Sequence, residues 1–157
     1  MKIKGLVEED FCNYRKPSMF IIFPNCTFKC DKEAGCAICQ NGALANEPAI
    51  DMSAIEIVSR YVKNPITKAI VFGGLEPWDS DWDIEQLIME FRKYTNDDII
   101  IYTGYTEEEL KNKITKVSCY NNIIIKYGRF IPNQDKHYDE VLGVELASSN
   151  QYARRIS

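Results

Sequence analysis

Four of the six cysteines in this chain lie within one short segment, between Cys26 and Cys39. Three residues separate Cys26 from Cys30, and two residues separate Cys36 from Cys39. Thiolates at such short spacings can all face one metal centre, whereas structural disulfides are usually spread more widely along a chain. The residue types and their spacing therefore predict metal chemistry.

The spacing alone leaves several kinds of site open. Iron–sulfur clusters are held by thiolates from short C-x2-C and C-x3-C pairs, and the pattern favours such a cluster. A structural zinc ion bound by all four cysteines is an alternative, although the five residues between Cys30 and Cys36 make a tight loop for zinc. A closed electron-transfer cluster with four cysteine ligands would also fit this spacing, as would a set of unrelated free thiols.

The segment FGGLEPW, from Phe72 to Trp78, is the second stretch whose residue types indicate chemistry. Glycines have no side chain, so a ligand can closely approach the backbone carbonyl groups of Gly73 and Gly74. Glu76 can accept a charge-assisted hydrogen bond from an ammonium group. The alternative is a tight strand-to-helix turn with an exposed glutamate, but its position one strand–helix unit after the cysteines favours a ligand site.

Apolar runs and helix caps place these motifs on a regular framework. The predicted strands are residues 18–23, 68–74, 98–104 and 122–128, and the predicted helices run from Ser53 to about Val62, over Ile84–Phe91 and from Thr106 to Lys113. This alternation predicts right-handed βαβ units around a mostly parallel sheet. Both motifs begin at the carboxyl ends of predicted strands, which is where α/β sheets bind ligands.

Composition indicates an ordinary globular protein. With 157 residues, of which 45% are hydrophobic and 27% charged, the chain can bury a substantial core. A formal net charge of −4 argues against a nucleic-acid partner. No apolar run approaches the roughly 20 residues of a membrane-spanning helix, and no secretory signal is visible, so we expect a cytoplasmic protein without a membrane partner. In that reducing compartment Cys12 and Cys119, which stand apart, are expected to be buried as small apolar side chains.

We expect a single domain, because no linker or internal repeat divides the chain. Residues 1–17 are expected to form an N-terminal extension, residues 24–42 a cluster loop, and residues from about 145 to 157 a surface-accessible tail. The tail carries only Arg154 and Arg155, which are too few for a nucleic-acid-binding arm.

The two motifs together resemble the radical S-adenosylmethionine (SAM) superfamily. The segment Cys26–Cys30, CTFKC, is similar to the opening of its C-x3-C-x2-C signature, and Gly73–Pro77 is similar to its GGEP motif with Leu75 as an extra residue. The resemblance implies a [4Fe–4S] cluster held by three cysteines, with one open iron that takes the amino and carboxylate groups of SAM. It also implies an α/β fold of the incomplete (βα) barrel type, with the cluster at the carboxyl ends of the strands.

On this resemblance we assign Cys26, Cys30 and Cys39 as cluster ligands and Ile38 as the contact for the SAM adenine. The chain departs from the signature, because eight residues, including Cys36, lie between Cys30 and Cys39. Cys36 can therefore be the second or third ligand instead, or a fourth ligand while SAM is absent.

The same resemblance assigns further residues to SAM itself. Gly73, Gly74 and Glu76 are expected at its ammonium group, and whether Leu75 displaces Glu76 from this group stays open. Thr103 or Tyr105 is expected at the ribose and Lys126 at the carboxylate of SAM, with core packing and ordinary surface exposure as equal alternatives. No catalytic side chain is implied beyond the cluster and SAM.

Two later segments resemble the activating proteins of anaerobic ribonucleoside-triphosphate reductase. YTGY at Tyr102–Tyr105 is similar to their TGY segment, and ELASSNQ at Glu145–Gln151 is similar to their closing SSNQ. This likeness implies reductive cleavage of SAM to methionine and a 5′-deoxyadenosyl radical, which forms a glycyl radical on the large reductase subunit. Flavodoxin or ferredoxin would donate the electron. A radical SAM enzyme for a small molecule and a non-enzymatic, metal-stabilised binding module are the competing hypotheses.

Overall fold

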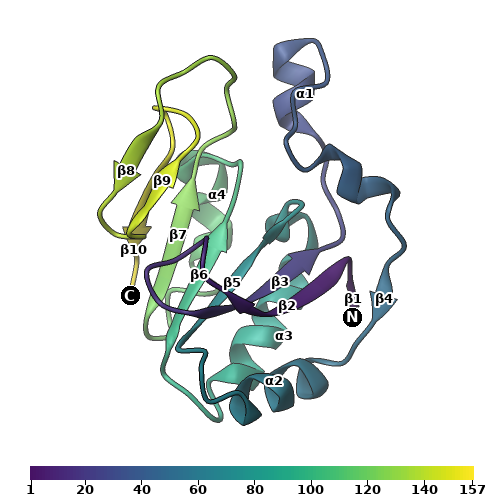
Figure 1. The fold of residues 1–157 in the computed structure, drawn as a ribbon, viewed down its shortest axis with the longest axis vertical. Helices are drawn as coiled ribbons and strands as arrows, with labels where there is room; N and C mark the ends of the chain where they lie inside the picture. The colour runs from purple at the N-terminus through teal and green to yellow at the C-terminus, as the bar shows by residue number, and fades with distance from the viewer.

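A computed structural model describes all 157 residues of the chain. A six-stranded mixed sheet forms its centre, with the strand order β10-β7-β6-β5-β3-β2 (Figure 1). The parallel strands are β3 (Ser18–Phe23), β5 (Ala69–Gly74), β6 (Asp98–Tyr102) and β7 (Ile123–Tyr127). The edge strands β2 (Gly5–Asp10) and β10 (Tyr152–Arg155) are antiparallel to their neighbours.

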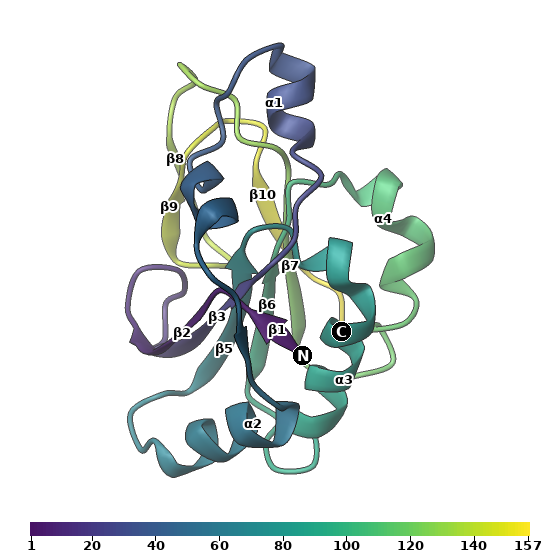
Figure 2. The same ribbon diagram turned by 90° about the vertical axis from the view of Figure 1, so that its right-hand side faces the viewer.

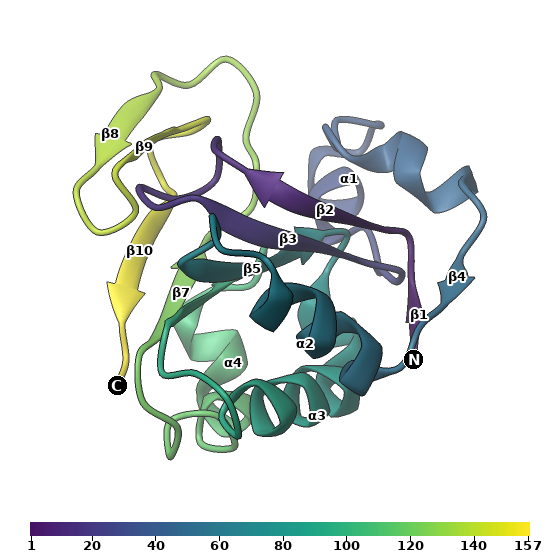
Figure 3. The ribbon, with the colours of Figure 1, turned by 60° about the horizontal axis from the view of Figure 1, so that its bottom comes forward.

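Three helices connect the parallel strands and cover one face of the sheet (Figures 2 and 3). They are α2 (Ala54–Lys63), α3 (Asp81–Phe91) and α4 (Glu107–Ile114). Ser53 caps α2 by accepting a hydrogen bond from the Glu56 amide at 3.1 Å, and Thr106 and Glu109 form a complete capping box at α4. The predicted alternation of strands and helices is confirmed, because caps and apolar runs are local signals.

The opposite face of the sheet is covered by segments outside the strand–helix alternation. Tyr14 from the loop after β2 packs there, together with Leu142 and Leu146 from a hairpin. The hairpin consists of β8 (His137–Asp139) and β9 (Val144–Leu146). These residues bury the second apolar face, which includes Ile100 and Ile124.

The expected incomplete (βα) barrel is wrong. The sheet is mixed, its two edges are antiparallel strands, and apolar side chains are buried on both of its faces. Alternation of strands and helices predicts which strands are neighbours, but closure into a barrel depends on pairing between distant segments. Residues 1–17 and 145–157, expected as an extension and a tail, contain the antiparallel strands that form the sheet edges.

Short elements surround the sheet. They are α1 (Lys29–Ala34), the 3-10 helices η1 (Gly42–Asn46) and η2 (Pro77–Ser80), and the paired strands β1 (Lys2–Ile3) and β4 (Ile50–Asp51). No helix has the length and apolar character that a membrane crossing requires. Cys12 and Cys119 are exposed, so the expectation that they are buried is wrong. Both lie in irregular connections, which run over protein surfaces.

Candidate functional site

The cysteine segment leaves the carboxyl end of β3 and rises above the sheet as α1 and the loop after it (Figure 1). Cys26 precedes α1, Cys30 lies in its first turn, and Cys39 lies in the following loop; all three are partly buried. Cys36 is exposed, and its thiol donates to a backbone carbonyl at the end of α1 at 3.7 Å. Cys36 therefore differs from the other three cysteines of the segment in being exposed.

Cys39 lies close enough to Cys26 and to Cys30 to contribute to the pKa of each. Burial is the main cause that raises the pKa of Cys26 to about 11; the Phe28 amide opposes it by hydrogen bonding to the sulfur, while Glu76 and Cys39 act in the same direction as burial. Burial also raises the pKa of Cys30, again with a contribution from Cys39. A nearby metal would favour the thiolate form that burial disfavours. Cys39 thus lies in the neighbourhood of both other thiols.

These thiols are not arranged around a single ion. No group of three Cys, His, Asp or Glu side chains converges in the way that a compact zinc site requires. A [4Fe–4S] cluster is larger than one ion and takes each cysteine on a different iron, so its ligands lie further apart. The cysteines therefore do not form a compact zinc site, and the choice of Cys26, Cys30 and Cys39 as cluster ligands stays a prediction.

Glu76 is a buried carboxylate beside these thiols, so the alternative of an exposed turn glutamate is wrong. Its Oε1 accepts hydrogen bonds from Thr103 Oγ1 at 2.8 Å and from Trp78 N at 3.1 Å, and its Oε2 accepts one from Gly104 N at 2.9 Å. Burial raises the pKa of Glu76 to about 7, although the three donors stabilise the charged form. A cationic ligand would offset this cost of desolvation.

Gly73 and Gly74 are required by the local backbone and its neighbours. Gly74 has a φ of +85°, and a Cβ atom there would lie 2.4 Å from Ile22 Cγ2. A Cβ atom on Gly73 would lie 2.7 Å from the ring of Phe20. The Gly74 carbonyl accepts a hydrogen bond from Asn41 Nδ2 at 2.7 Å, so it faces the cysteine loop.

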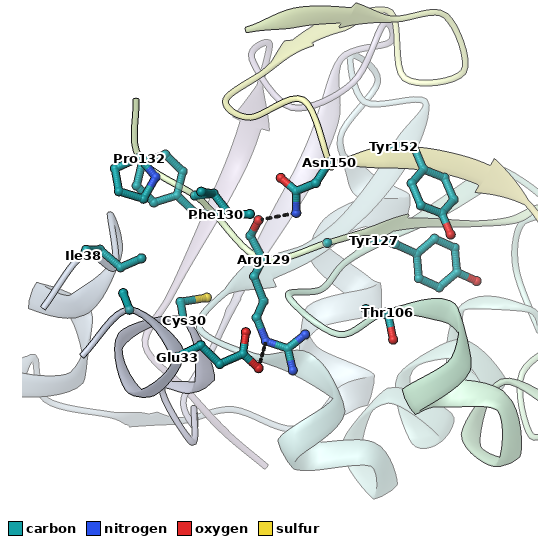
Figure 4. A pocket seen from close by; sticks show the side chains of 13 residues that line it. Cys30, Glu33, Ile38, Thr106, Tyr127, Arg129, Phe130, Pro132, Asn150 and Tyr152 are labelled. Atoms are coloured by element: carbon teal, nitrogen blue, oxygen red, sulfur yellow. Dashed lines mark hydrogen bonds and ion pairs between the residues drawn. The ribbon is translucent and has the colours of Figure 1, made fainter. Parts of the chain in front are cut away.

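Two cavities meet at Cys30. The smaller, of about 20 Å³, is also lined by Cys26, Glu76 and Gly104. The larger, of about 460 Å³, lies between the cysteine loop and the segment after β7, and Ile38 lines it (Figure 4). Ile38 and Glu76 thus line different cavities, and Cys30 lines both.

Thr103 lies beneath Glu76 rather than at a cavity wall. It is buried, its hydroxyl donates to Glu76, and the same oxygen accepts a hydrogen bond from Tyr105 N at 3.0 Å. Because its single donor is used inside the protein, the hydroxyl orients the carboxylate. The Thr103 hydroxyl therefore has no hydrogen left to donate to a ribose in this arrangement.

Two residues of the site were not singled out from the sequence. A Cβ atom on Gly104 would lie 3.6 Å from Glu76 Oε2 and 3.7 Å from Cys30 Sγ, so glycine leaves space between carboxylate and thiol. Arg129 lines both cavities, and its guanidinium binds Glu109 and Glu33 (Figure 4). The glycine of the TGY segment was an available signal for Gly104. Arg129 follows a turn that has no recognisable chemical pattern.

Lys126 adds a buried positive group to the same edge of the sheet. Its Nζ donates to the Gly128 carbonyl at 3.1 Å, and the side chain is almost inaccessible. Burial lowers the pKa of Lys126 to about 8, while Glu76 and Cys30 act in the opposite direction. Acidic, basic and thiol groups therefore converge here, as they do in many functional sites.

Comparison with known families identifies the kind of cofactor that this site holds. The family model described as a 4Fe-4S single cluster domain matches residues 16–152, a range that includes all four cysteines of the loop and all four parallel strands. No curated protein and no solved structure matches the chain. Since the matched range covers most of the sequence, the chain belongs to the 4Fe-4S single cluster domain family.

Proposed function

We propose that this 4Fe-4S protein binds SAM beside its cluster, cleaves it reductively and forms a glycyl radical on an anaerobic ribonucleoside-triphosphate reductase. The proposal assigns Cys26, Cys30 and Cys39 to the cluster. The observation that carries it is the buried carboxylate of Glu76, which lines the same small cavity as Cys26 and Cys30. A structural metal site has no need of such a group.

Glu76 is suited to hold the ammonium group of SAM. Thr103 and Gly104 fix its orientation through hydrogen bonds, and the missing side chain of Gly104 leaves room between the carboxylate and Cys30. An ammonium group would lower the raised pKa of Glu76 by favouring its charged form. The extra residue Leu75 is itself buried, and Glu76 still lies beside the thiols.

The remaining contacts of SAM are assigned by position. Ile38 offers an apolar surface for the adenine in the larger cavity, which Cys30 also lines. The carbonyl of Gly74 faces the cysteine loop and accepts a hydrogen bond from Asn41, and its second lone pair can accept one from the SAM amine. The protein's part in the reaction is to bind, orient and shield SAM, because the cofactor carries the bond cleavage.

The chemistry that the reduced cluster supplies when bound is one electron, which breaks the C5′–S bond of SAM and yields methionine and a 5′-deoxyadenosyl radical. The radical then takes a hydrogen atom from a glycine Cα of the reductase, which leaves 5′-deoxyadenosine and a glycyl radical. A flavodoxin or ferredoxin is the proposed source of the electron.

Support for a reductase partner comes from the YTGY and SSNQ segments. In the structure, Ser148 N donates to Gln151 Oε1 at 3.2 Å, and Gln151 Nε2 donates to the Gly128 carbonyl at 3.2 Å. The SSNQ segment therefore holds the turn at Gly128, which lines the larger cavity beside Cys30. A loop of the partner protein would reach the site through this cavity.

The first test is formation of 5′-deoxyadenosine by anaerobically reconstituted protein with SAM and dithionite. We expect product from the wild type and from Cys119→Ala, and none from Cys26→Ala. Glu76→Gln should weaken SAM binding roughly tenfold to a hundredfold, because a hydrogen bond to a charged group contributes about 1.5–3 kcal/mol. Glu108→Gln, an exposed control, should bind normally. A wild-type protein with full iron and sulfide but no product would contradict the proposal.

The partner is tested separately, by electron paramagnetic resonance after addition of the anaerobic reductase from the same organism. A glycyl radical that requires SAM and the wild-type protein is the expected result. SAM cleavage that responds to a metabolite and leaves the reductase without a radical would instead identify an enzyme that acts on a small molecule.

A further inference from the structure

We propose that Asp31 and Asn41 are positioning residues that hold Cys39 in place as the third ligand of the cluster. This inference rests on the ligand set of the proposed function. Neither residue has a chemical role in that reaction, and neither is a ligand of the cluster. The way in which the loop after α1 is held supports this role.

Asp31 organises the loop from inside. It lies in the first turn of α1, and its Oδ1 accepts hydrogen bonds from Ile38 N at 2.9 Å and from Cys39 N at 2.8 Å. The side chain takes part in no other hydrogen bond and in no ion pair of the structure. One carboxylate oxygen therefore closes the eight-residue insertion and orients the backbone at Cys39.

Asn41 fastens the same loop to the sheet. Its Nδ2 donates to the Gly74 carbonyl at 2.7 Å, where β5 ends beside the thiols. Gly42 N donates to the Cys39 carbonyl at 3.2 Å, so a tight turn joins Cys39 to Asn41 and to η1. The position of Asn41 on the sheet is thereby transmitted to Cys39 over two residues.

The loop has few other means of holding this position. Neither α1 nor η1 contains a buried residue, so apolar packing contributes little to the location of Cys39. The ion pairs of α1 join Lys29 to Glu109 and Glu33 to Arg129, and neither involves the loop that contains Cys39. Polar contacts that orient metal ligands usually change metal affinity about 10- to 100-fold when they are removed.

The test compares variants of Asp31 by the rate at which reconstituted protein loses iron to a chelator under anaerobic conditions. Asp31→Ala should lose iron about 10- to 100-fold faster than the wild type. Asp31→Asn should behave like the wild type, because its carbonyl oxygen can accept the same two backbone hydrogen bonds. Lys32→Ala is the matched control, since Lys32 is the next residue of α1, is exposed, and its side chain makes no hydrogen bond or ion pair.

Asn41→Ala should also lose iron faster, and amide hydrogen exchange of the cluster-free protein gives an independent readout for both positions. Exchange at Ile38 and Cys39 should increase in Asp31→Ala and stay unchanged in Asp31→Asn. Thermal unfolding should differ little among these variants, because the loop buries no core residue.

Cys39→Ala separates this inference from the proposed ligand set. If Cys39→Ala keeps a stable cluster, the ligand set is wrong. If Cys39→Ala loses its cluster while Asp31→Ala and Asn41→Ala retain iron as the wild type does, only the positioning role is wrong. Loss of iron from Asp31→Asn as fast as from Asp31→Ala would also overturn it, because charge and not the two hydrogen bonds would then be responsible.

Discussion

At the scale of single residues, burial determines how Glu76 behaves in the free protein. Its three hydrogen-bond donors would lower the pKa, yet desolvation outweighs them and raises it from 4.5 to about 7. Between these two values the folded chain binds more protons at Glu76 than the unfolded chain does. The free energy of unfolding therefore falls as pH rises through this interval. Above about pH 7 the whole contribution of Glu76 to this fall has been reached.

Chemical denaturation of cluster-free protein between pH 4.5 and 8 measures this effect. The wild type should lose roughly 3 kcal/mol from this group over that range, at about 1.36 kcal/mol per pKa unit. Glu76→Gln should lack this part of the pH dependence, whereas Glu108→Gln should keep it. Parallel pH profiles for the wild type and Glu76→Gln would show that the carboxylate is not buried in solution.

At the scale of elements, α1 is held above the sheet by charges. Lys29 and Arg129 bind Glu109 at 3.1 and 2.5 Å, and Arg129 Nε lies 3.1 Å from Glu33 Oε1. The Arg129 hydrogen bond is the main cause that lowers the pKa of Glu109 to about 2, so these pairs persist at ordinary pH. Since α1 buries no residue, we expect its local stability to depend on salt.

Hydrogen exchange of the α1 amides tests this dependence. Glu33→Gln removes one partly exposed pair and should speed exchange about two- to fivefold, as expected for a contribution of about 0.5–1 kcal/mol. High salt should have a similar effect on the wild type and a smaller additional effect on the variant. Lys32→Ala serves as the control. Exchange in α1 that is equally slow in all three proteins and at all salt concentrations would rule out an electrostatic attachment.

At the scale of the whole molecule, the two chain ends form the edges of the sheet instead of hanging free. β10 pairs with β7, Tyr152 packs on Tyr127 with ring centroids 5.3 Å apart, and Arg155 binds Asp98 at 2.8 Å. Asp98 also accepts hydrogen bonds from Tyr14 and Lys16. One buried carboxylate therefore joins both ends of the chain to β6. The stability of the sheet thus depends on contacts between distant segments.

Deletion of residues 152–157 tests this dependence. We expect a lower denaturation midpoint and a loss on the order of 3 kcal/mol, from the packing of Ala153 and Ile156 against the core and the hydrogen bonds of β10. Arg154→Ala is the control, because it removes only an ion pair between exposed side chains. An unchanged midpoint after the deletion would show that the sheet is complete without β10.

Local patterns determined much of this protein from the sequence alone. The four parallel strands, the three helices and the caps at Ser53 and Thr106 follow from apolar runs and capping residues, which act within a few positions. The cysteine loop and the GGLEP turn were also placed correctly at the carboxyl edge of the sheet, because parallel strands end there together.

Only the tertiary structure decided how distant residues meet. It replaced the expected barrel by a mixed sheet, since edge pairing by residues 1–17 and 145–157 depends on long-range contacts. It left Cys36 exposed while the other three cysteines of the segment are partly buried. It also brought Gly104 between Glu76 and Cys30, which lie far apart in the sequence. Spacing along a chain identifies residues that can bind a cluster, whereas burial and packing determine which of them face it.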